Sequence, residues 1–286
     1  MLKIENRRLS FLLVLAVYIL TAAVGILTYR ATAHLPLWAA LLLADVAATA
    51  AVFLFSLLFG NASVYDPYWS VQPPVILCAL AIEGRAFSAA DILLLLAVLI
   101  WAVRLTANWA YTFHGLTHED WRYRMLRGKT GALYPFVNFL GIHLFPTLVV
   151  YACILPAAYT LRVGEGGGVL FAVGLVISLL AATLQLVADC EMQAFRKHGE
   201  GGFIRVGIWR NARHPNYLGE ILMWWGIALA SLSRLPLVYL PLILGALVNN
   251  LMFLFISIPM ADRRQAEKPG YAEYKKETRS LFPLPR

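Results

Sequence analysis

Apolar residues run through most of this chain in long, nearly uninterrupted stretches. Seven of them are about long enough to cross a hydrocarbon core of ~30 Å as a helix. An eighth, 73–81, is shorter and begins with two prolines, so we expect a broken or half span there. The pattern predicts an all-α membrane bundle of seven to eight transmembrane segments. The seven long stretches are residues 10–29, 37–59, 89–113, 134–157, 168–190, 216–231 and 235–259.

The composition is that of a polytopic membrane protein. Of the 286 residues, 60% are hydrophobic and only 14% are charged, so nearly every apolar stretch must lie in lipid. No linker or repeat divides the chain, and we expect a single integral membrane domain over residues 1–286. The first stretch follows Lys3, Arg7 and Arg8 as in a signal peptide. No small-residue cleavage site follows it, so it predicts a retained span.

Cysteine and histidine spacing predicts no metal site. Cys78, Cys153 and Cys190 lie in or beside apolar stretches without CxxC spacing, which favours neither a disulfide framework nor zinc. Only His114 and His118 have ligand spacing, and two histidines are too few for a di-iron centre. We therefore expect no metal.

Basic residues fall mainly on one side of the membrane when eight segments are threaded with the N-terminus inside. That side receives 19 of the 24 lysines and arginines. The other side receives Arg30, Arg85, Arg162 and Arg234, and Arg104 is left within a span. With seven spans instead of eight, the basic residues would be distributed over both sides of the membrane. The positive-inside rule then predicts cytoplasmic termini, and we expect a multi-pass protein of the bacterial inner membrane.

The net charge of +8 is concentrated in three cytoplasmic segments and makes no nucleic-acid-binding face. Orientation and attraction to anionic lipid account for its sign. They do not account for accompanying polar residues such as Tyr123 in one loop and Asn211 and Asn216 in another. Beside arginines, such side chains favour a phosphorylated cofactor. The glycine-rich segments 164–168 and 199–202 open no βαβ unit, so the site is not a Rossmann one.

The segment 213–220 contains several side chains that can bind a ligand or take part in catalysis. It reads Arg-His-Pro-Asn-Tyr-Leu-Gly-Glu and opens an apolar helix. Pro215 suits the first helical position, and the N–H groups of the first turn favour an anion as a guest. The alternative is an interfacial cap in which Arg213 reaches lipid headgroups and Glu220 pairs with a neighbouring helix. We favour a functional role because Glu220 lies a full turn inside, where a carboxylate is costly.

Polar residues recur at helical spacing upstream of this segment. Gln185, Asp189 and Gln193, followed by Arg196 and Lys197, form one stripe that runs down a membrane helix into the basic loop. A polar stripe on an otherwise apolar membrane helix indicates the lining of a cavity.

Three charged residues lie elsewhere in or beside apolar stretches. Arg104, with Asn108 one turn later, needs a carboxylate partner or a phosphate, because an unpaired guanidinium there costs at least ~2.5–3.5 kcal/mol. Asp66, before Pro67, fits a helix cap and a functional carboxylate equally well. Asp45 stays unassigned.

Five pieces of the sequence, taken in order, carry a family resemblance. They are Arg104-Leu-Thr-Ala-Asn108-Trp109, Glu119-Asp120-Trp121-Arg122-Tyr123, the stripe at 185–197, the segment 213–220, and the tail with Tyr271-x2-Tyr274 and Phe282-Pro283. Together they resemble the steroid 5α-reductase family, in particular its bacterial uncharacterised branch. The resemblance covers about residues 60–286, and residues 1–36 look like an additional N-terminal helix. Sterol reductases and membrane isoprenylcysteine carboxyl methyltransferases carry segments similar to 213–217.

The resemblance implies a helical membrane reductase that binds NADPH among its C-terminal helices and transfers hydride to the β-carbon of an α,β-unsaturated ketone. The family's substrate-facing glutamate corresponds to Asp66, and the glutamine before it to Tyr65. Its ketone-facing tyrosine corresponds to Trp101, which cannot donate a phenolic proton. Expected substrate-binding residues are Trp101, Arg104 and Asn108. Expected cofactor-binding residues, with the basic loop included, are Gln185, Asp189, Arg196, Lys197, Arg205, Arg213, His214, Asn216, Tyr217, Glu220, Asp262 and Arg263.

The expected reaction needs a proton donor. Hydride addition to an enone develops negative charge on the carbonyl oxygen, and a donor aimed at that oxygen stabilises the enolate. A carboxyl group in an apolar cavity has its pKa raised by desolvation, so it can stay protonated near neutrality. We predict Asp66 as the acid, with Tyr65 or Tyr68 sharing the role. The substrate would be a steroid-like hydrophobic molecule from the bilayer, and we expect no obligate protein partner.

Two other classes of function remain open. A membrane methyltransferase using S-adenosylmethionine would need an adenosine pocket. It would not need residues that bind three phosphates, so the dense basic loops argue against it. A non-catalytic lipid- or sterol-binding protein or transporter would give no reason for the 185–196 stripe to end in the same basic loop as Arg213. Cofactor binding, NADPH against S-adenosylmethionine, separates these classes.

Overall fold

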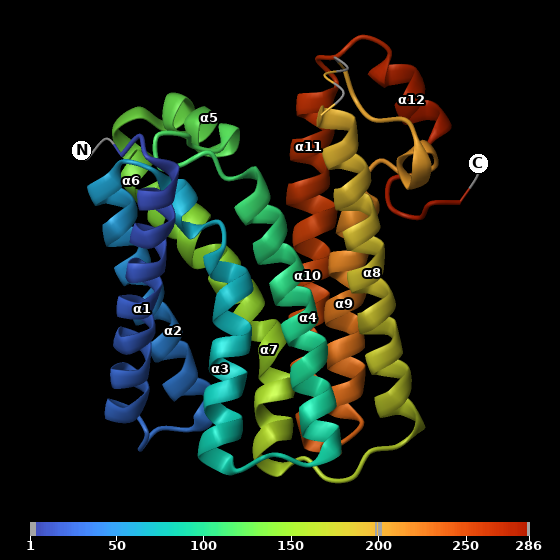
Figure 1. Ribbon diagram of the computed structural model, residues 1–286. Helices are drawn as coiled ribbons and strands as arrows, with labels where there is room; N and C mark the ends of the chain where they lie inside the picture. Colours follow the sequence, from blue (N-terminus) through green and yellow to red (C-terminus); the bar gives the residue numbers. More distant parts are fainter. Residues whose placement is uncertain (1–3, 198, 200–201, 285–286) are drawn as a thin grey trace. The chain divides into compact units, whose positions relative to one another are not determined.

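The computed structural model describes residues 4–197, 199 and 202–284, and every regular element within these ranges is helical (Figure 1). Among the described residues, six helical runs are long and apolar enough to cross a membrane: Arg7–Ala31, Leu37–Phe59, Ala89–Thr112, Trp121–Val163, Val169–Lys197 and Leu237–Gln265. The protein is therefore an all-helical, multi-pass membrane protein. Its residues cluster into two compact units. The first contains Met1–Cys78 and Leu105–Leu155, and the second contains Ala79–Arg104 and Pro156–Arg286.

The first unit begins with two long helices, α1 (Arg7–Ala31) and α2 (Leu37–Phe59). Asn6 caps α1, since its side-chain oxygen accepts from the N–H groups of Arg8 and Leu9, and such a cap satisfies donors that a helix start leaves free. Gly60 ends α2 in the left-handed conformation, with φ of 64°, which glycine adopts without strain. The unit continues with η1 (Ala62–Tyr65), α3 (Tyr68–Gly84) as far as Cys78, and the end of α4 (Ala89–Thr112).

The rest of the first unit is a short polar helix and one long helical run. Asp120 caps α5 (Trp121–Thr130) by accepting from Arg122 N. The run consists of η2 (Gly131–Leu133), α6 (Tyr134–Val137), the π-helix η3 (Asn138–Leu144) and α7 (Phe145–Val163), which continues into the second unit.

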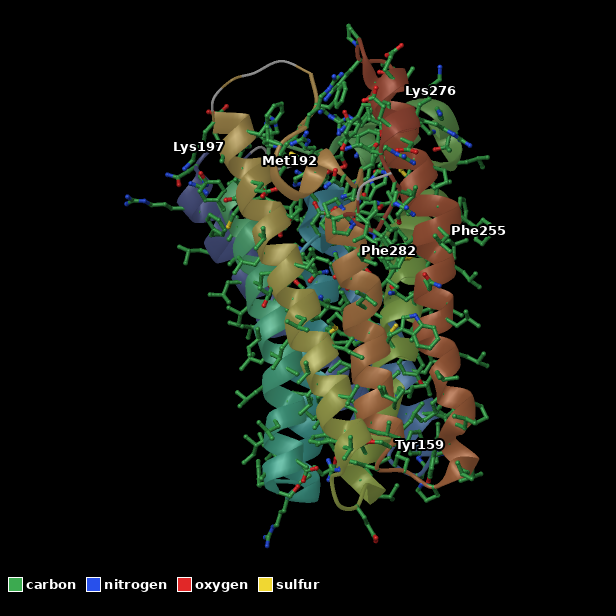
Figure 2. The ribbon with its side chains drawn as sticks, turned by 90° about the vertical axis from the view of Figure 1, so that its right-hand side faces the viewer. Tyr159, Met192, Lys197, Phe255, Lys276 and Phe282 are labelled. Atoms are coloured by element: carbon green, nitrogen blue, oxygen red, sulfur yellow. The ribbon has the colours of Figure 1, made fainter. Side chains whose placement is uncertain are left out.

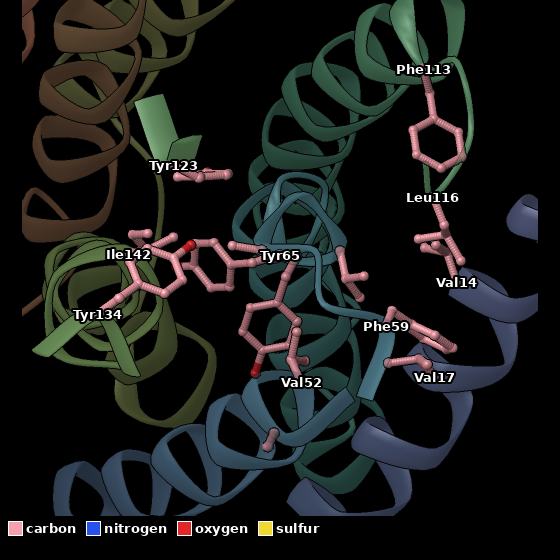
Figure 3. Close-up of a cluster of buried hydrophobic side chains, with 14 residues drawn as sticks. Val14, Val17, Val52, Phe59, Tyr65, Phe113, Leu116, Tyr123, Tyr134 and Ile142 are labelled. Carbon is pink, nitrogen blue, oxygen red and sulfur yellow. The ribbon is translucent and has the colours of Figure 1, made fainter. Parts of the chain in front are cut away.

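Buried apolar side chains from most of these elements form the core of the first unit (Figure 3). α1 supplies Val14 and Val17, and α2 supplies Val52. The opposite face of α1 is apolar too: Leu12 is 63% exposed and Ile19 is 62% exposed. A helix that is apolar on both faces is typical of a membrane span with lipid on one side.

The second unit contains the end of α3, the start of α4, the end of α7 and all later elements. These are α8 (Val169–Lys197), η4 (Gly207–Arg210), α9 (Pro215–Leu232), η5 (Leu237–Ile243), α10 (Leu244–Met252), the π-helix η6 (Phe253–Ser257), α11 (Ile258–Gln265) and α12 (Tyr271–Glu277). Figure 2 shows Phe255 pointing away from its helical run, where it is 73% exposed. This orientation fits a lipid-facing side chain.

α8 and α9 approach each other so closely that their backbones touch. A Cβ atom added to Gly226 would lie 2.3 Å from Ser178 Oγ and 2.6 Å from the Gly174 carbonyl oxygen. A Cβ on Gly219 would lie 2.4 Å from Gln185 Cγ. Small residues allow such contact between membrane helices. The contact holds Gln185 directly against the first turns of α9.

A buried ion pair joins three loops at one end of the second unit. Arg234 Nη1 lies 2.8 Å from Asp91 Oδ1, and the two side chains are only 3% and 9% exposed. Arg234 Nε also donates to the Gly166 carbonyl at 2.7 Å, and Ser88 Oγ donates to Asp91 at 2.7 Å. The sequence placed Arg234 at the outer membrane side without a partner.

Residues 73–81 were expected to form a broken or half span, and the break is wrong, because α3 continues as one helix of 17 residues through Pro73 and Pro74. Proline removes a backbone bond, but membrane helices tolerate it where neighbouring polar groups satisfy the freed carbonyls. The stretch expected at 216–231 is the helix α9. Neither α3 nor α9 is among the six runs above.

Candidate functional site

Glu220 is the centre of a polar cluster inside the second unit. It lies in the second turn of α9, which Pro215 opens at the first helical position, and it is 4% exposed. Its Oε2 accepts from Trp101 Nε1 at 2.9 Å and from Gln185 Nε2 at 2.7 Å, and its Oε1 accepts from Trp224 Nε1 at 2.9 Å. Three neutral donors from α4, α8 and α9 thus hold one buried carboxyl group.

An ion pair lies one helical turn from this group on two of the same helices. Arg104 Nη1 is 2.5 Å from Asp189 Oδ2, and the side chains are 8% and 13% exposed. The expected carboxylate partner of Arg104 is therefore Asp189, which the sequence assigned to the cofactor. Spacings of three residues on α4, from Trp101 to Arg104, and four on α8, from Gln185 to Asp189, place both interactions on the same helix faces.

Two polar atoms of this cluster have no hydrogen-bond partner among the residues that the structure describes. They are Arg104 Nε, a donor, and Gln185 Oε1, an acceptor. A buried polar atom without a partner costs about 1–3 kcal/mol. One unused donor and one unused acceptor, a helical turn from a buried carboxyl group, can bind a ligand that offers both kinds of group. We call Trp101, Arg104, Gln185, Asp189, Glu220 and Trp224 the carboxyl cluster.

The start of α9 is held by the C-terminal part of the chain. Asp262 on α11 accepts from His214 Nε2 at 2.9 Å and from Tyr271 OH at 2.5 Å, and its other oxygen lies 3.1 Å from Lys275 Nζ. Arg213 Nε joins the same carboxylate at 3.2 Å. In this structure Arg213, His214 and Asp262 bind one another, and their role toward a cofactor stays a prediction.

The backbone contributes to the same contact. The N–H groups of Arg213 and His214 donate to the carbonyls of Arg279 and Ser280, each at 3.0 Å. Burial raises the pKa of Tyr274 to about 12, so its hydroxyl stays protonated and donates to the Trp209 carbonyl. The tail is therefore part of the architecture around this helix start.

The remaining expected cofactor residues lie around this end of the second unit. Asn216 offers its backbone carbonyl to Gln185 Nε2 at 3.4 Å, and the Tyr217 ring stacks on His214 with centroids 5.2 Å apart. Arg205 lies over the Phe203 ring at 4.3 Å. Lys197 at the end of α8 lies at the same end of the unit as Lys276 (Figure 2). Arg205 is exposed, as are Arg196 and Arg263.

A second candidate site, in the first unit, contains Asp66. This residue follows η1, its side chain is 19% exposed, and its Oδ1 accepts from Tyr123 OH at 2.5 Å. Arg122 Nη2 lies 3.9 Å away. Burial raises the pKa of Asp66 to about 6, although Arg122 and Tyr123 both favour the carboxylate. The cap on α5 at Asp120 sets the position of both partners.

The two tyrosines expected beside Asp66 direct their hydroxyl groups elsewhere. Tyr68 OH donates to Asp45 Oδ1 at 3.1 Å, and Tyr65 OH lies 2.9 Å from Thr147 Oγ1. Their catalytic role stays a prediction. Sequence reasoning missed Tyr123 as the partner of Asp66, although the motif at 119–123 contains it.

Trp224 was also missed as a partner of Glu220. Its spacing of four residues from Glu220 on one helix was a usable signal. Asn108, one turn after Arg104 on α4, is half-buried, and its contact with substrate stays a prediction.

Comparison with known proteins supplies the family. The family described as "Protein of unknown function (DUF1295)" matches residues 52–278. The chain belongs to this family. The matched range contains every candidate residue of both units and leaves out α1.

One relative in this comparison is a protein of Schizosaccharomyces pombe described as "Uncharacterized protein C594.04c". It is 26% identical over 192 residues, which cover 57% of this chain and 56% of the relative. The chain thus spans little more than half the length of that relative. No solved structure matches the chain.

Proposed function

We propose that this protein is a membrane-embedded NADPH-dependent reductase, which reduces the C=C bond of a hydrophobic α,β-unsaturated ketone. The observation that carries the proposal is the pair of unused atoms in the carboxyl cluster, Arg104 Nε and Gln185 Oε1. The carboxamide of nicotinamide has an acceptor oxygen and a donor NH₂ group. It can accept from Arg104 and donate to Gln185, which would satisfy both atoms at once.

The charge of the same unit supports a phosphorylated cofactor. Arg196 and Lys197 end α8, about three turns beyond Gln185 on one helix, and Arg210 is exposed in the following loop. Guanidinium groups bind phosphate oxygens with two parallel hydrogen bonds. NADPH, with its additional 2′-phosphate, fits this charge better than NADH does.

The cofactor would supply the hydride, and the protein would supply orientation and a proton donor. Asp66 is the proposed acid, because burial keeps its pKa near 6 and a protonated carboxyl group can stabilise a developing enolate. Tyr123 positions it through the 2.5 Å hydrogen bond. The substrate class remains that of the family resemblance, a steroid-like or smaller cyclic enone that enters from lipid.

The proposed topology has eight crossings, with α3 and α9 added to the six long runs. An even number returns the chain to the side on which it began, and the charge asymmetry places that side in the cytoplasm. The location would be the bacterial inner membrane.

The experiment that tests the function is cofactor binding to the purified full-length chain in nanodiscs. NADPH binding is followed by energy transfer from tryptophan to the reduced nicotinamide. We expect Gln185→Leu to weaken NADPH binding about tenfold, because one hydrogen bond to a buried group is lost. The matched control is Thr183→Val, because that hydroxyl bonds only within its own helix, to the Leu179 carbonyl, and it should change nothing.

Two further comparisons make the result decisive. Arg196→Ala should weaken NADPH much more than NADH, and equal loss for both would remove the 2′-phosphate assignment. S-Adenosylmethionine is titrated in parallel. Binding of S-adenosylmethionine without binding of NADPH would overturn the reductase and leave the methyltransferase. Oxidation of NADPH with cyclic enones then measures the reaction itself.

A further inference from the structure

A line of buried polar side chains crosses the first unit within the membrane helices. Two residues come from α2, one from η1, and three from the run that contains the π-helix η3. Each is at most 2% exposed. We call these residues the polar seam: Thr49, Ser56, Tyr65, Asn138, His143 and Thr147.

The hydroxyl protons at the centre of the polar seam are all used. Thr147 donates its proton to the His143 carbonyl at 2.9 Å. The Tyr65 hydroxyl, 2.9 Å from Thr147 Oγ1, must therefore be the donor in that contact. Thr49 donates to the same oxygen at 3.2 Å. No hydroxyl of this group has a proton left for a ligand.

The orientation of the Asn138 amide follows from the same assignment of hydrogen-bond donors and acceptors. Ser56 donates its only hydroxyl proton to the Phe53 carbonyl at 2.8 Å. The Asn138 atom that lies 3.3 Å from Ser56 Oγ must then be the donor, Nδ2. The other amide atom, Asn138 Oδ1, is buried and has no partner among the residues that the structure describes.

The tautomer of His143 is fixed in a similar way. Nδ1 lies 3.0 Å from the Asn138 carbonyl oxygen, which can only accept, so Nδ1 carries the hydrogen. In the neutral ring Nε2 is therefore an acceptor. It too is buried without a partner in the described part of the chain.

Both unused atoms of the polar seam are thus acceptors. Each costs about 1–3 kcal/mol when left unpaired, and both belong to the π-helix η3, a geometry that recurs at functional sites. Protonating Nε2 would place a cation among the rings of Tyr65 and Phe53, whose centroids lie 4.7 and 5.5 Å from that of His143. A charge is costly there, so a neutral O–H donor is the fitting partner.

We propose that the polar seam binds the hydroxyl group of an apolar molecule from the bilayer, whose single proton is shared between His143 Nε2 as the principal acceptor and Asn138 Oδ1 as the second. A ketone cannot take this place, since it brings only an acceptor. The other face of the same helical run is apolar and open to lipid in a membrane, since Phe136 is 67% exposed and Leu140 is 54% exposed. This site needs no cofactor and stands whether or not the second unit binds NADPH.

The test compares alcohols with their own methyl ethers, which differ only in the O–H donor. Farnesol, dodecanol and cholesterol, each with its ether, are titrated against the full-length chain in nanodiscs. We expect at least one alcohol to bind about tenfold more tightly than its ether, as one neutral hydrogen bond predicts. A buried water offers the same donor, and if water alone serves the site no alcohol will be preferred, which overturns the proposal.

Variants locate the preference in the polar seam. His143→Phe keeps an aromatic ring but removes the acceptor, and it should reduce the preference for the alcohol to within about twofold. Asn138→Leu should reduce it partly. Thr112→Val is the matched control, because among the described residues that hydroxyl bonds only to carbonyls of its own helix, and it should keep the full preference. A preference that survives His143→Phe would place the hydroxyl elsewhere. The comparison on the parent protein requires no variant to fold.

Discussion

Removing one charge of the Arg104 and Asp189 pair should destabilise the second unit severely. The two side chains are 8% and 13% exposed and lie 2.5 Å apart, and Arg104 Nε already lacks a partner within the described part of the chain. Asp189→Asn leaves a guanidinium inside the helices without its counter-charge. Breaking a buried pair in this way costs about 3–5 kcal/mol. At roughly 2–4 °C per kcal/mol for a unit of this size, we expect Tm to fall by about 6–20 °C.

The matched control is an exposed pair in the same unit with nearly the same geometry. Arg162 Nη2 lies 2.6 Å from Glu83 Oε2, but these side chains are 30% and 50% exposed. Water solvates each charge once its partner is gone, so Glu83→Gln should cost only about 0–1 kcal/mol. Burial is then the main difference between the two experiments.

The assay is thermal unfolding of the purified chain in one detergent, followed by tryptophan fluorescence. A double variant, Arg104→Met with Asp189→Leu, removes both charges and should regain most of the lost Tm, because apolar side chains of similar volume are often neutral replacements for a buried pair. Equal shifts for Asp189→Asn and Glu83→Gln would refute the reasoning. A double variant as unstable as Asp189→Asn alone would show that packing, not charge, explains the loss.

Three further predictions follow from other parts of the molecule. If protonated Asp66, with its pKa of about 6, is the acid, kcat/KM for enone reduction should fall about tenfold per pH unit above pH 6. Tyr123→Phe removes a donor to the carboxylate, so it should raise the pKa of Asp66 and move this fall to higher pH. A flat profile from pH 5 to 8 would exclude the role. Gly226→Ala should lower stability by about 1–3 kcal/mol in thermal unfolding through overpacking. Gly128→Ala, where a Cβ meets nothing within 4 Å, should raise it by about 0.5–1 kcal/mol. A C-terminal fusion to a reporter active only in the periplasm should stay silent, and a strong signal would contradict the eight-crossing topology.

Much of the helical architecture could be predicted from the apolar stretches. The stretch 37–59 coincides with α2, and 89–113 differs from α4 by one residue. The prolines at 73 and 74 misled because proline penalties are calibrated on water-exposed helices, whereas membrane helices have other ways to satisfy the freed carbonyls. The two π-helices could not be predicted, since a π-turn depends on tertiary packing more than on local residue preference.

The candidate site was predictable in part. The stripe at 185–197 and the segment 213–220 correctly marked helices that meet, and Arg104 was correctly expected to need a charged partner. Which carboxylate pairs with which donor could not be deduced, because Asp189 and Glu220 both lie in apolar helical stretches and only the packing of α4 against α8 and α9 distinguishes them. The hydrogen-bond partners of Tyr65, Tyr68 and Tyr123 could not be deduced either, because they too depend on how the elements of the first unit pack.

The contact between α8 and α9 also limits how the second unit can move. Where Gly174, Ser178 and Gly226 bring two backbones together, there is no layer of side chains that could repack as one helix rotates or slides past the other. The two helices must therefore move as one rigid body. Any opening that admits a ligand must occur along the faces of α8 and α9 that point away from their contact. The tail segment 279–280 is hydrogen-bonded to the residues that begin α9. A displacement of this segment would therefore move α8 and α9 together, including the loop that follows α9 at Leu232.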